Sequence, residues 1–416
     1  MTTPSVYSIL FDFYHDIPAA WYDLCPKDIL GMDLEVLGIF QRTLSDQCRC
    51  SGLMLKDQQQ QLVGCAALCV FPVELIETNA PIVIRLRDAV RRLWPTFLRI
   101  NVVFCGLPVP SGSSHLVVKE DADVVAIIEE VERNMRILAK KHRGMLLVFK
   151  ELNELDAPLA TTLSAQRYVY GGIPPMHLFE RAFADFGDYM RALKSRYRMQ
   201  IARSQKKLEE AGFEVLQGRG NSFFNEHFNA RAYSLYVEVQ QRAARKLELM
   251  TPAFFSEMAA RLDNEVLLTV IRKEGRVCAF TFSITRGRTH YNMYSGLDYA
   301  LSREGDLYFN LFYNDMDRAF RDGVTSMHLG QTSDGFKSRL GTRAQALWFF
   351  AKSPSAFINR ILHQVAPLMF PKVSAVERND VFNKSPPSKK MASADRSGGK
   401  KFRANTRTCN GLRRSA

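Results

Sequence analysis

Hydrophobic and polar residues alternate along this chain in short blocks, some with the period of a strand and some with that of a helix. In the first half, apolar runs at Leu53–Lys56 and Leu62–Val70 flank a polar turn and predict a β-hairpin. Asn101–Cys105 and Met145–Phe149 are predicted as further strands, and Val124–Lys141 between them has apolar residues at helical spacing. Strands interspersed with helices predict a mixed α+β fold.

The second half repeats this order of elements. The predicted elements are strands at Glu265–Ile271, Arg276–Thr285 and Thr289–Tyr294, a helix over Leu307–Arg321 and a strand at Ser326–Leu329. Repetition of one supersecondary order within a chain predicts a duplicated fold. We therefore expect two tandem domains, each a mixed sheet flanked by helices, at residues 1–182 and 183–370.

The basic charge of the chain is concentrated in its last residues. The whole chain has 56 Lys and Arg residues and 43 acidic residues, which gives a net charge of +13. Residues 371–416 alone contain 12 of these basic residues and 3 of the acidic ones. This segment is also rich in Ser, Gly and Pro and poor in large apolar residues, a composition typical of disorder. We predict a disordered basic tail, and we expect no DNA binding by the nearly balanced body.

The cysteines predict neither a zinc site nor a disulfide framework. No CxxC pair occurs among the eight, and neither Cys48-x-Cys50 nor Cys65-x3-Cys69 has a second half at metal-binding spacing. We expect them to be buried and reduced, with no bound metal. The first residues lack a basic signal-peptide region, and the longest apolar run, Leu62–Val73, is too short to span a membrane. A cytoplasmic protein is expected.

A basic amphipathic segment separates the two halves. Apolar residues from Met190 to Leu208 follow one helical face within Phe183–Gly212, and seven Lys and Arg residues occur with no acid between Tyr189 and Leu208. Such a face is either solvated surface or a binding surface for a phosphate-rich ligand, because Arg and Lys bind phosphate oxygens strongly.

No common catalytic motif occurs in the chain. Gly330-Gln-Thr-Ser-Asp-Gly335-Phe-Lys337-Ser338 is similar to a phosphate-binding loop, but Phe336 separates glycine from lysine and no long helix is predicted to follow. The eight histidines are scattered. His328 differs from the others, because it lies on a short strand that enters a glycine-rich loop, where sites often form.

Several segments resemble the acyltransferase domain of the GNAT superfamily, in its Fem-like and CelD-like branch. The resemblance covers about residues 183–352 and is carried by Phe186-Gly-Asp-Tyr189, Leu247-Glu-Leu-Met-Thr251-Pro-Ala-Phe-Phe255, the strand block Val266–Tyr294 and Met327-His-Leu-Gly-Gln-Thr-Ser333 up to Gly341. It implies that the first half is a diverged second GNAT-like domain, as in Fem-like proteins with tandem domains.

The resemblance implies transfer of an acyl group to an amine. Most of the superfamily takes the acyl group from acyl-CoA, and Fem-like members use aminoacyl-tRNA and a peptidoglycan precursor. We expect an N-acyltransferase that uses acyl-CoA as co-substrate, with no permanently bound cofactor, and a small-molecule or amino-acid-like amine as acceptor. The alternatives are a Fem-like transferase that uses aminoacyl-tRNA, which the basic segment favours, and a non-catalytic GNAT-like binding protein.

The resemblance also suggests site residues. His328 is the candidate general base, since imidazole titrates near neutral pH, and Tyr294 is the candidate acid. Lys337 is a candidate for stabilising an oxyanion or for binding a substrate phosphate or carboxylate. The family's phosphate-binding loop corresponds to Leu301–Leu307, but this chain lacks its glycine pattern and has two acids there. The remaining candidates are Arg303, Gly305, Asp306 and Leu307 for the cofactor, and Lys194, Arg196, Arg198 and Gln331 for the substrate.

Overall fold

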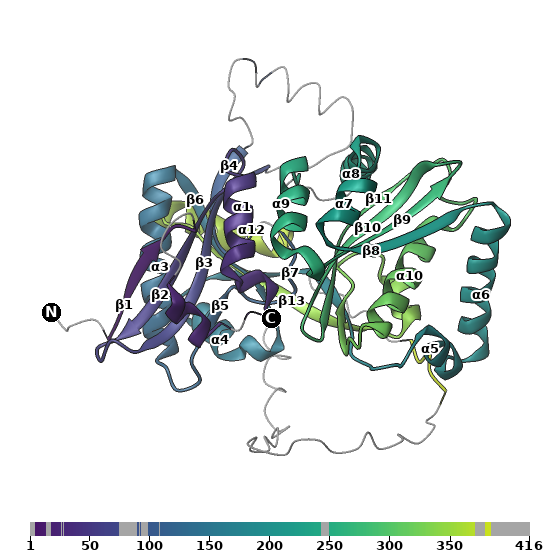
Figure 1. The fold of residues 1–416 in the computed structure, drawn as a ribbon. Helices are drawn as coiled ribbons and strands as arrows, with labels where there is room; N and C mark the ends of the chain where they lie inside the picture. Colours follow the sequence, from purple (N-terminus) through teal and green to yellow (C-terminus); the bar gives the residue numbers. More distant parts are fainter. Residues whose placement is uncertain are drawn as a thin grey trace. The chain divides into compact units, whose positions relative to one another are not determined.

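A computed structural model describes residues 5–13, 18–25, 27, 29–74, 90, 92, 99–107, 109–242, 249–370 and 379–383. These residues form one mixed 13-stranded sheet with helices on both faces (Figure 1). The strands lie in the order β1 (Val6–Phe11), β2 (Arg49–Asp57), β3 (Leu62–Glu74), β4 (Arg99–Cys105), β6 (Gly144–Leu152), β13 (Arg343–Lys352), β7 (Val169–Phe179), β12 (Ser326–His328), β11 (Thr289–Leu297), β10 (Arg276–Arg286), β9 (Val266–Lys273) and β8 (Glu214–Arg219), and β5 (Leu116–Val118) pairs with β3.

The sheet has the same pairing pattern when it is followed inward from either edge. From β1, three antiparallel pairings lead to β4, which pairs in parallel with β6, and β6 is antiparallel to β13. From β8, three antiparallel pairings lead to β11, which pairs in parallel with β12, and β12 is antiparallel to β7. The structure therefore confirms the predicted fold class, a tandem repeat of one mixed-sheet unit.

The two halves exchange a strand at the centre of the sheet. β7 follows β6 in the chain but lies beside β12, whereas β13 follows β12 but lies beside β6. The two exchanged strands also pair with each other, from Arg343 opposite Leu178 to Ala351 opposite Val169. Each half thus supplies the strand that covers the open edge of the other half. The division at residue 182 stays a prediction.

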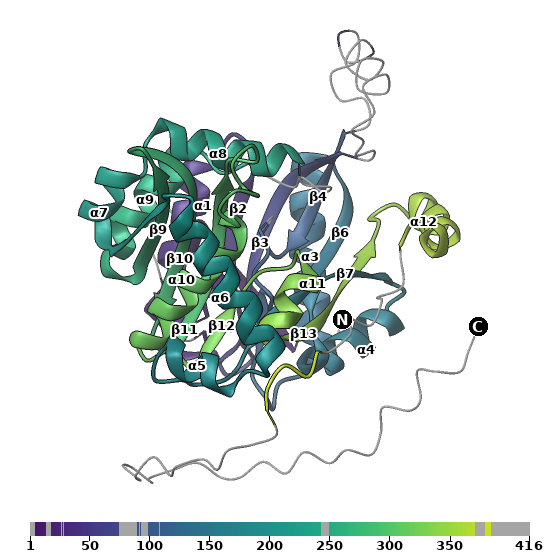
Figure 2. The ribbon, with the colours of Figure 1, turned by 90° about the vertical axis from the view of Figure 1, so that its right-hand side faces the viewer.

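Corresponding helices cover corresponding faces of the two half-sheets. α3 (Val124–His142) packs on β4 and β6, and α10 (Leu307–Arg321) packs on β9 and β10. α6 (Ser195–Glu210) lies across α10, as Figure 2 shows. α3 and α10 each bury one apolar face, as the spacing of apolar residues in the sequence predicts. α4 (Ala157–Ala165) contacts α3, and α12 (Ala356–Met369) contacts β7.

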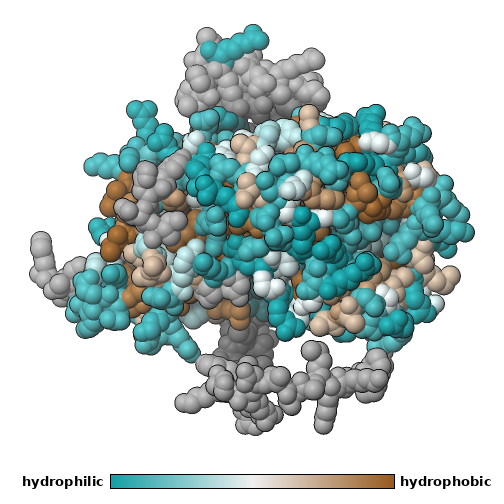
Figure 3. Space-filling view, viewed as in Figure 1, coloured by the Kyte–Doolittle hydropathy of each residue, from teal (hydrophilic) through white to brown (hydrophobic). Residues whose placement is uncertain are grey.

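The other faces of the two half-sheets share one hydrophobic core. α1 (Leu34–Thr43) covers the first half, and α7 (Gly220–His227), α8 (Ala230–Arg242) and α9 (Pro252–Leu262) cover the second. α1 and α9 pack together, with the rings of Phe40 and Phe254 5.1 Å apart. Most of the face seen in Figure 3 is hydrophilic, with smaller hydrophobic areas between, which is consistent with this burial of apolar side chains.

Local sequence signals place the ends of several elements. Asp123 caps α3 by accepting hydrogen bonds from the amides of Val125 and Ala126. Thr251 caps α9, and Pro252 occupies the first helical position, where its missing N–H costs nothing. The turn between β9 and β10 uses Glu274 and Gly275, both with positive φ, which suits a tight hairpin.

The basic segment between the halves is two helices, where the sequence pattern suggested one continuous face. α5 (Phe186–Ala192) ends before Leu193 and Lys194, whose backbones are extended, and α6 begins at Ser195. Another segment of the chain pairs with the backbone between the two helices. Leu193 forms a β-bridge with Phe382, and the amide of Lys194 donates to the carbonyl of Val381. Residues 379–382 therefore pack on the body, and most of the predicted tail lies outside the described residues.

The seven described cysteines are free thiols and buried, as the apolar runs around four of them predict, and Cys409 lies outside the described residues. Among the helices that the structure describes, none has the length and apolar composition needed to cross a membrane.

Candidate functional site

The parallel strands β11 and β12 part in the second half. They pair at Thr289 with Ser326, at His290 with Met327 and at Tyr291 with His328, and β11 then continues to Leu297 while β12 ends. The chain beyond β12 turns through Gly330 and Ser333, both in the left-handed region with φ of 82° and 64°, into the short helix α11 (Asp334–Lys337). Several polar side chains lie around this turn. We call the turn from Gly330 to Ser333, together with these side chains, the β12-end site.

His328 lies on one face of the sheet at this site. Its ring packs on that of Tyr291, with 4.7 Å between ring centres. Its Nδ1 is buried and makes no hydrogen bond to any described residue. Burial lowers the pKa of His328 to about 4, and Glu180 and the backbone of Ser111 oppose the shift. The imidazole is therefore neutral at pH 7 and a weak base, since efficient general bases have a pKa nearer the working pH.

A buried carboxylate ties the first half to the same site. Glu151 is fully buried, and its Oε2 accepts hydrogen bonds from the amide and hydroxyl of Ser111 (2.8 and 2.6 Å) and from the amide of Gly112 (3.1 Å). Its Oε1 accepts one from Nε2 of Gln331 at 3.1 Å. Lys150 and these donors outweigh burial and lower the pKa of Glu151. The ionised carboxylate thus joins the loop before β5 to the turn after β12.

A second set of groups lies on the opposite face of β7 and β12. His328 is directly across from Leu178 in the antiparallel pair, so these two side chains share a face, and His177 points to the other face. His177 is fully buried, with Nε2 3.0 Å from Oδ1 of Asp334 and Nδ1 2.9 Å from Oγ1 of Thr342. The Asp334 side chain is 47% exposed.

Burial keeps the His177 ring neutral and sets the direction of its hydrogen bonds. Burial lowers the pKa of His177, and Lys337 adds to this effect while Asp334 opposes it. In a neutral ring Nε2–H donates to Asp334, while Nδ1 and the carbonyl of Lys337 compete as acceptors for the single hydroxyl proton of Thr342. The buried histidine then orients an exposed carboxylate at the end of β12.

Lys337 is buried on the same short helix as Asp334. Its exposed fraction is 2%, and its Nζ lies 5.5 Å from the ring centre of Phe312. Nζ has no hydrogen-bond or ion-pair partner among the described residues, and a side chain at Gly330 would place its Cβ 3.2 Å from Nζ. Burial lowers the pKa of Lys337 to about 7, and Asp334 opposes this. The amine can therefore exchange a proton near neutral pH.

Tyr294 lies in the core that covers the other end of β11. Its ring packs against those of Tyr236, Phe254 and Phe255, with ring centres 5.5–5.7 Å away. The structure thus brings His328 together with Tyr291, and it places Tyr294 in an aromatic cluster and Lys337 on the opposite face from His328. The catalytic roles suggested for these residues stay predictions.

The predicted cofactor residues lie together on the loop before α10, which is closed by its own contacts. Asp306 pairs with Lys207 at 2.7 Å, and Glu304 pairs with Lys273, while Arg303 is exposed. The amide of Leu307 donates to the carbonyl of Ser302, and a Cβ on Gly305 would lie 2.7 Å from the Phe213 ring. Two carboxylates and an occupied amide do not favour pyrophosphate binding. The acyl-CoA site stays a prediction.

The predicted substrate residues lie in two places. Gln331 is at the β12-end site, whereas the three basic residues are at the start of α6. There Lys194 pairs with Asp380 at 2.8 Å, Arg196 stacks on the ring of Tyr197 at 4.5 Å, and Arg198 donates to the carbonyl of Leu193.

Sequence patterns alone missed three residues of the β12-end site: Glu151, His177 and Asp334. Asp334 lies inside the segment that carries the family resemblance, so its place in that segment is the signal that could have identified it. Glu151 and His177 meet their partners only through the pairing of β6, β13, β7 and β12. That pairing depends on the strand exchange, for which the sequence has no local signal.

Comparison with known proteins identified one family. The model of the FemAB-like family, described as peptidoglycan biosynthesis and recognition, matches residues 108–370, which include Glu151, His177 and the whole β12-end site. No curated protein matched the chain.

Solved structures give distant likenesses. FemX is 12% identical, with a TM-score of 0.49 over 79% of this chain and 92% of that one. A tandem GNAT protein from the clavulanic acid biosynthesis pathway is 12% identical, with a TM-score of 0.46 over 84% of this chain and 99% of that one. L-PGS from Bacillus licheniformis is 12% identical, with a TM-score of 0.41 over 65% and 83%. Similarity at this level carries no argument about substrate.

Proposed function

This chain belongs to the FemAB-like family of peptidoglycan biosynthesis and recognition, and from that premise we propose that it transfers an aminoacyl group to a cell-wall peptide precursor. The donor would be aminoacyl-tRNA, as in the Fem-like members that the sequence resembles. The acceptor would be a free amine on the peptide of the precursor. The observation that carries this proposal is the family match across residues 108–370, which spans the β12-end site.

The reaction requires three catalytic functions from the protein. The amine must be neutral when it attacks the ester carbonyl, so a base must hold or accept its proton. The carbonyl oxygen becomes an oxyanion, which preorganised donors stabilise. A new C–N bond forms while the ester C–O bond breaks, and the leaving hydroxyl of the tRNA must gain a proton.

Asp334 is suited to the first function, deprotonation of the attacking amine. Its carboxylate is 47% exposed, so an incoming ammonium group can reach it, and His177 holds it from the buried side at 3.0 Å. A carboxylate fixed by a neutral imidazole keeps its negative charge for the substrate. We assign to Asp334 the binding of the acceptor amine and the removal of its proton.

Lys337 is suited to the other two functions, stabilisation of the oxyanion and protonation of the leaving oxygen. With a pKa of about 7 it is partly protonated at neutral pH, so it can stabilise the oxyanion as an ammonium and return a proton to the leaving oxygen. Its side chain is 2% exposed and lies against Gly330, so contact with substrate requires displacement of the turn at Gly330–Ser333. His328, with a pKa of about 4, is less suited to proton transfer.

The basic start of α6 suits the nucleic-acid part of the donor. Arg196 and Lys194 are at least partly exposed, and the next turns of α6 add Arg203 and Lys206 with no acid before Glu209. Lys and Arg side chains bind nucleic-acid phosphates without regard to sequence, as a transferase for a shared tRNA body requires.

A transfer assay tests the proposal. The purified chain is incubated with tRNA carrying a labelled amino acid and with a UDP-linked peptide precursor that has a free lysine or diaminopimelate amine, and the label on the precursor is measured. We expect transfer that requires the amine, because an N-acetylated precursor cannot attack. Labelled acetyl-CoA with small amines forms the second arm. Transfer from acetyl-CoA alone would establish the acyl-CoA function instead, and no transfer in either arm would favour a non-catalytic binding protein.

Charge reversal separates donor binding from chemistry. Lys194→Glu with Arg198→Glu should weaken retention of charged tRNA by tenfold or more and lower its dependence on salt. Reversal of the exposed pair Lys140 and Lys141 on α3 serves as a control and should leave retention unchanged. Equal loss in both variants would remove α6 as the tRNA surface.

A further inference from the structure

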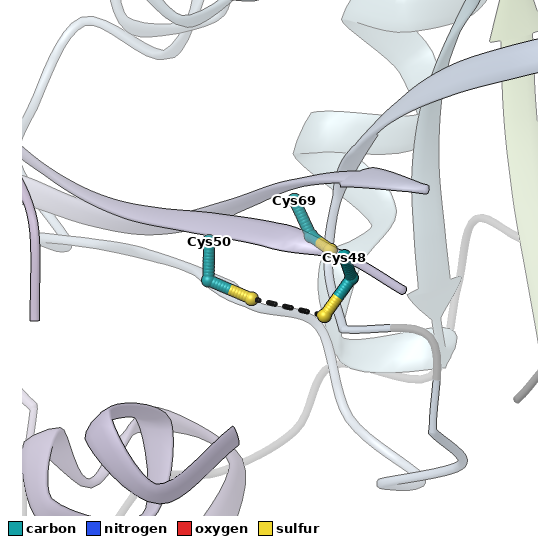
Figure 4. A group of neighbouring side chains, drawn as sticks. All are labelled: Cys48, Cys50 and Cys69. Atoms are coloured by element: carbon teal, nitrogen blue, oxygen red, sulfur yellow. Dashed lines mark hydrogen bonds between the residues drawn. The ribbon is translucent and has the colours of Figure 1, made fainter. Parts of the chain in front are cut away.

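Three cysteine thiols meet in the core of the first half, away from the β12-end site (Figure 4). Cys48 comes directly before β2, Cys50 is on β2 and Cys69 is on β3. Their sulfur atoms all lie within 4.8 Å of one another, and Sγ of Cys48 is 3.8 Å from Sγ of Cys50. All three residues are 3% exposed or less.

The hairpin register explains why these thiols meet. Cys50 and Cys69 are direct partners in the antiparallel pair of β2 and β3, so their side chains share a face. Cys48 is two residues before Cys50, and alternation along the strand places it on that face as well. The segment that holds Cys48 is itself fixed, because its amide donates to the carbonyl of Leu44 and the neighbouring Gln47 bonds to Leu249 of the second half.

The donor set matches a soft metal ion. Thiolate sulfur is the ligand that Cu(I) and zinc prefer among protein groups. In a trigonal site with metal–sulfur distances of about 2.3 Å, the sulfurs are about 4.0 Å apart, which is close to the spacing of Cys48 and Cys50. The thiolate is the form of cysteine that binds metal.

The number of ligands favours Cu(I) over zinc. Structural zinc takes four protein ligands in a tetrahedron. Among the described residues the group consists of three cysteines, with no histidine or carboxylate in it, and the thiols are too deeply buried for a water ligand to come from bulk solvent. We propose that Cys48, Cys50 and Cys69 form a binding site for one soft metal ion of low coordination number, Cu(I).

The bound ion would crosslink three points of the chain. It would join the segment after α1 to both strands of the β2–β3 hairpin, and through Gln47 and Leu249 it would stiffen the contact between the halves. This role is separate from acyl transfer, since the cluster shares no residue with the β12-end site.

Two other arrangements of the same thiols make different predictions. Cys50 and Cys69 could instead form a cross-strand disulfide, which would leave Cys48 alone. A second thiol pair, Cys25 and Cys65, lies on the same side of β3, with Cys25 within hydrogen-bonding reach of Cys65. This pair provides a matched control, because it is equally buried but has only two sulfurs.

Copper retention tests the site. The full chain, reduced and kept without oxygen, is loaded with Cu(I) and challenged with excess of a coloured Cu(I) chelator. We expect one ion retained per chain, and retention at least tenfold weaker in Cys48→Ser, Cys50→Ser and Cys69→Ser. Cys65→Ser and Cys278→Ser should retain the ion as the unchanged chain does. X-ray absorption of the loaded chain should show a copper shell of three sulfurs.

The outcomes separate the alternatives. No retained ion, equal retention in all variants, or loss in Cys65→Ser would overturn the proposal. A copper shell with nitrogen or oxygen would do so as well, and this measurement needs no variant, so it stays informative if the serine variants fail to fold. A Cys50–Cys69 disulfide in chain prepared without reductant, with no copper retained after reduction, would identify a redox pair instead.

Discussion

His177 Nε2 lies 3.0 Å from Oδ1 of Asp334, and this contact joins a strand of the first half to a helix of the second. His177 is fully buried, whereas Asp334 reaches solvent. The pair exists because β7 leaves its own half-sheet and lies beside β12. The strand exchange therefore builds the candidate site as well as the sheet, and the site requires both halves of the chain.

Replacement of the exposed carboxylate should abolish most transfer and leave the fold intact. Asp334→Asn keeps the size of the side chain but removes its charge and basicity, so we expect kcat/KM to fall by about 10²- to 10⁴-fold, the range for loss of a positioned base. Asp317→Asn on α10 is the control, because the one ion-pair partner of Asp317 in the described part of the chain is the surface residue Arg321. Equal activity of the Asp334 variant and the unchanged chain would exclude the assigned role.

The buried lysine should make stability depend on pH in the alkaline range. The pKa of Lys337 is about 7 in the folded chain and 10.5 in a model peptide, so between these values the unfolded chain binds more protons and stability rises with pH. The full difference is about 5 kcal/mol at 1.36 kcal/mol per pKa unit. In Lys337→Met this rise should be absent.

Urea unfolding of both chains at pH 6, 8 and 9.5 measures this effect. The packing change caused by methionine is independent of pH, so it shifts the whole curve of the variant without changing its slope. Equal differences between the two chains at pH 6, 8 and 9.5 would show that Lys337 is not the group that titrates.

Local patterns predict much of the secondary structure of this chain. The helix predicted over Leu307–Arg321 coincides with α10, and that over Val124–Lys141 differs from α3 by one residue, because both have an uninterrupted apolar face. The hairpins are predicted because polar turns interrupt apolar runs, as at Glu274 and Gly275. Amphipathic spacing and turn chemistry are local properties of a sequence, which is why they can be read without a structure.

The parts that depend on long-range pairing were not predictable. Nothing in Val169–Phe179 shows that it lies beside β12 and not beside β6, so the partnership of His177 and Asp334 was missed. Lys337 is a candidate site residue in the sequence analysis, but its burial depends on packing against Gly330 and Phe312, which the sequence does not show. The cysteine cluster was missed for the same reason, since cross-strand register and not sequence spacing brings Cys69 to Cys48 and Cys50.

The buried carboxylate that joins the halves should be far more important to stability than its glutamine partner. Glu151→Ala leaves the donors of Ser111 and Gly112 without their acceptor and removes the carboxylate that lies 3.5 Å from the Lys150 ammonium, so we expect a loss of about 3–5 kcal/mol. Gln331→Ala removes one hydrogen bond between the two residues, for about 1 kcal/mol.

Denaturant unfolding of the two single variants and the double variant gives the coupling between them. The double variant should lose less than the sum, because the bond that Gln331 makes is already gone in Glu151→Ala. Strict additivity would mean that Glu151 and Gln331 do not interact in solution and that the halves are joined by other contacts.

A fully buried histidine should make the chain sensitive to acid. His115 is packed between Gly31 and Gly106, and neither of its ring nitrogens has a hydrogen-bond partner among the described residues. Burial lowers the pKa of His115 to about 4, while Glu151 raises it and Lys150 lowers it further. The unfolded chain therefore binds an extra proton between pH 6.5 and 4, and the folded chain loses about 3 kcal/mol over that interval.

His115→Leu should remove that loss, because leucine does not titrate and needs no hydrogen-bond partner. We expect the variant to be at least as stable as the unchanged chain at pH 7.5 and clearly more stable at pH 4.5, as measured by urea unfolding at both values. His328 titrates in the same direction in both chains, so its contribution cancels in the comparison. If the difference in free energy of unfolding is the same at the two pH values, the His115 ring is already protonated or hydrated in the folded chain.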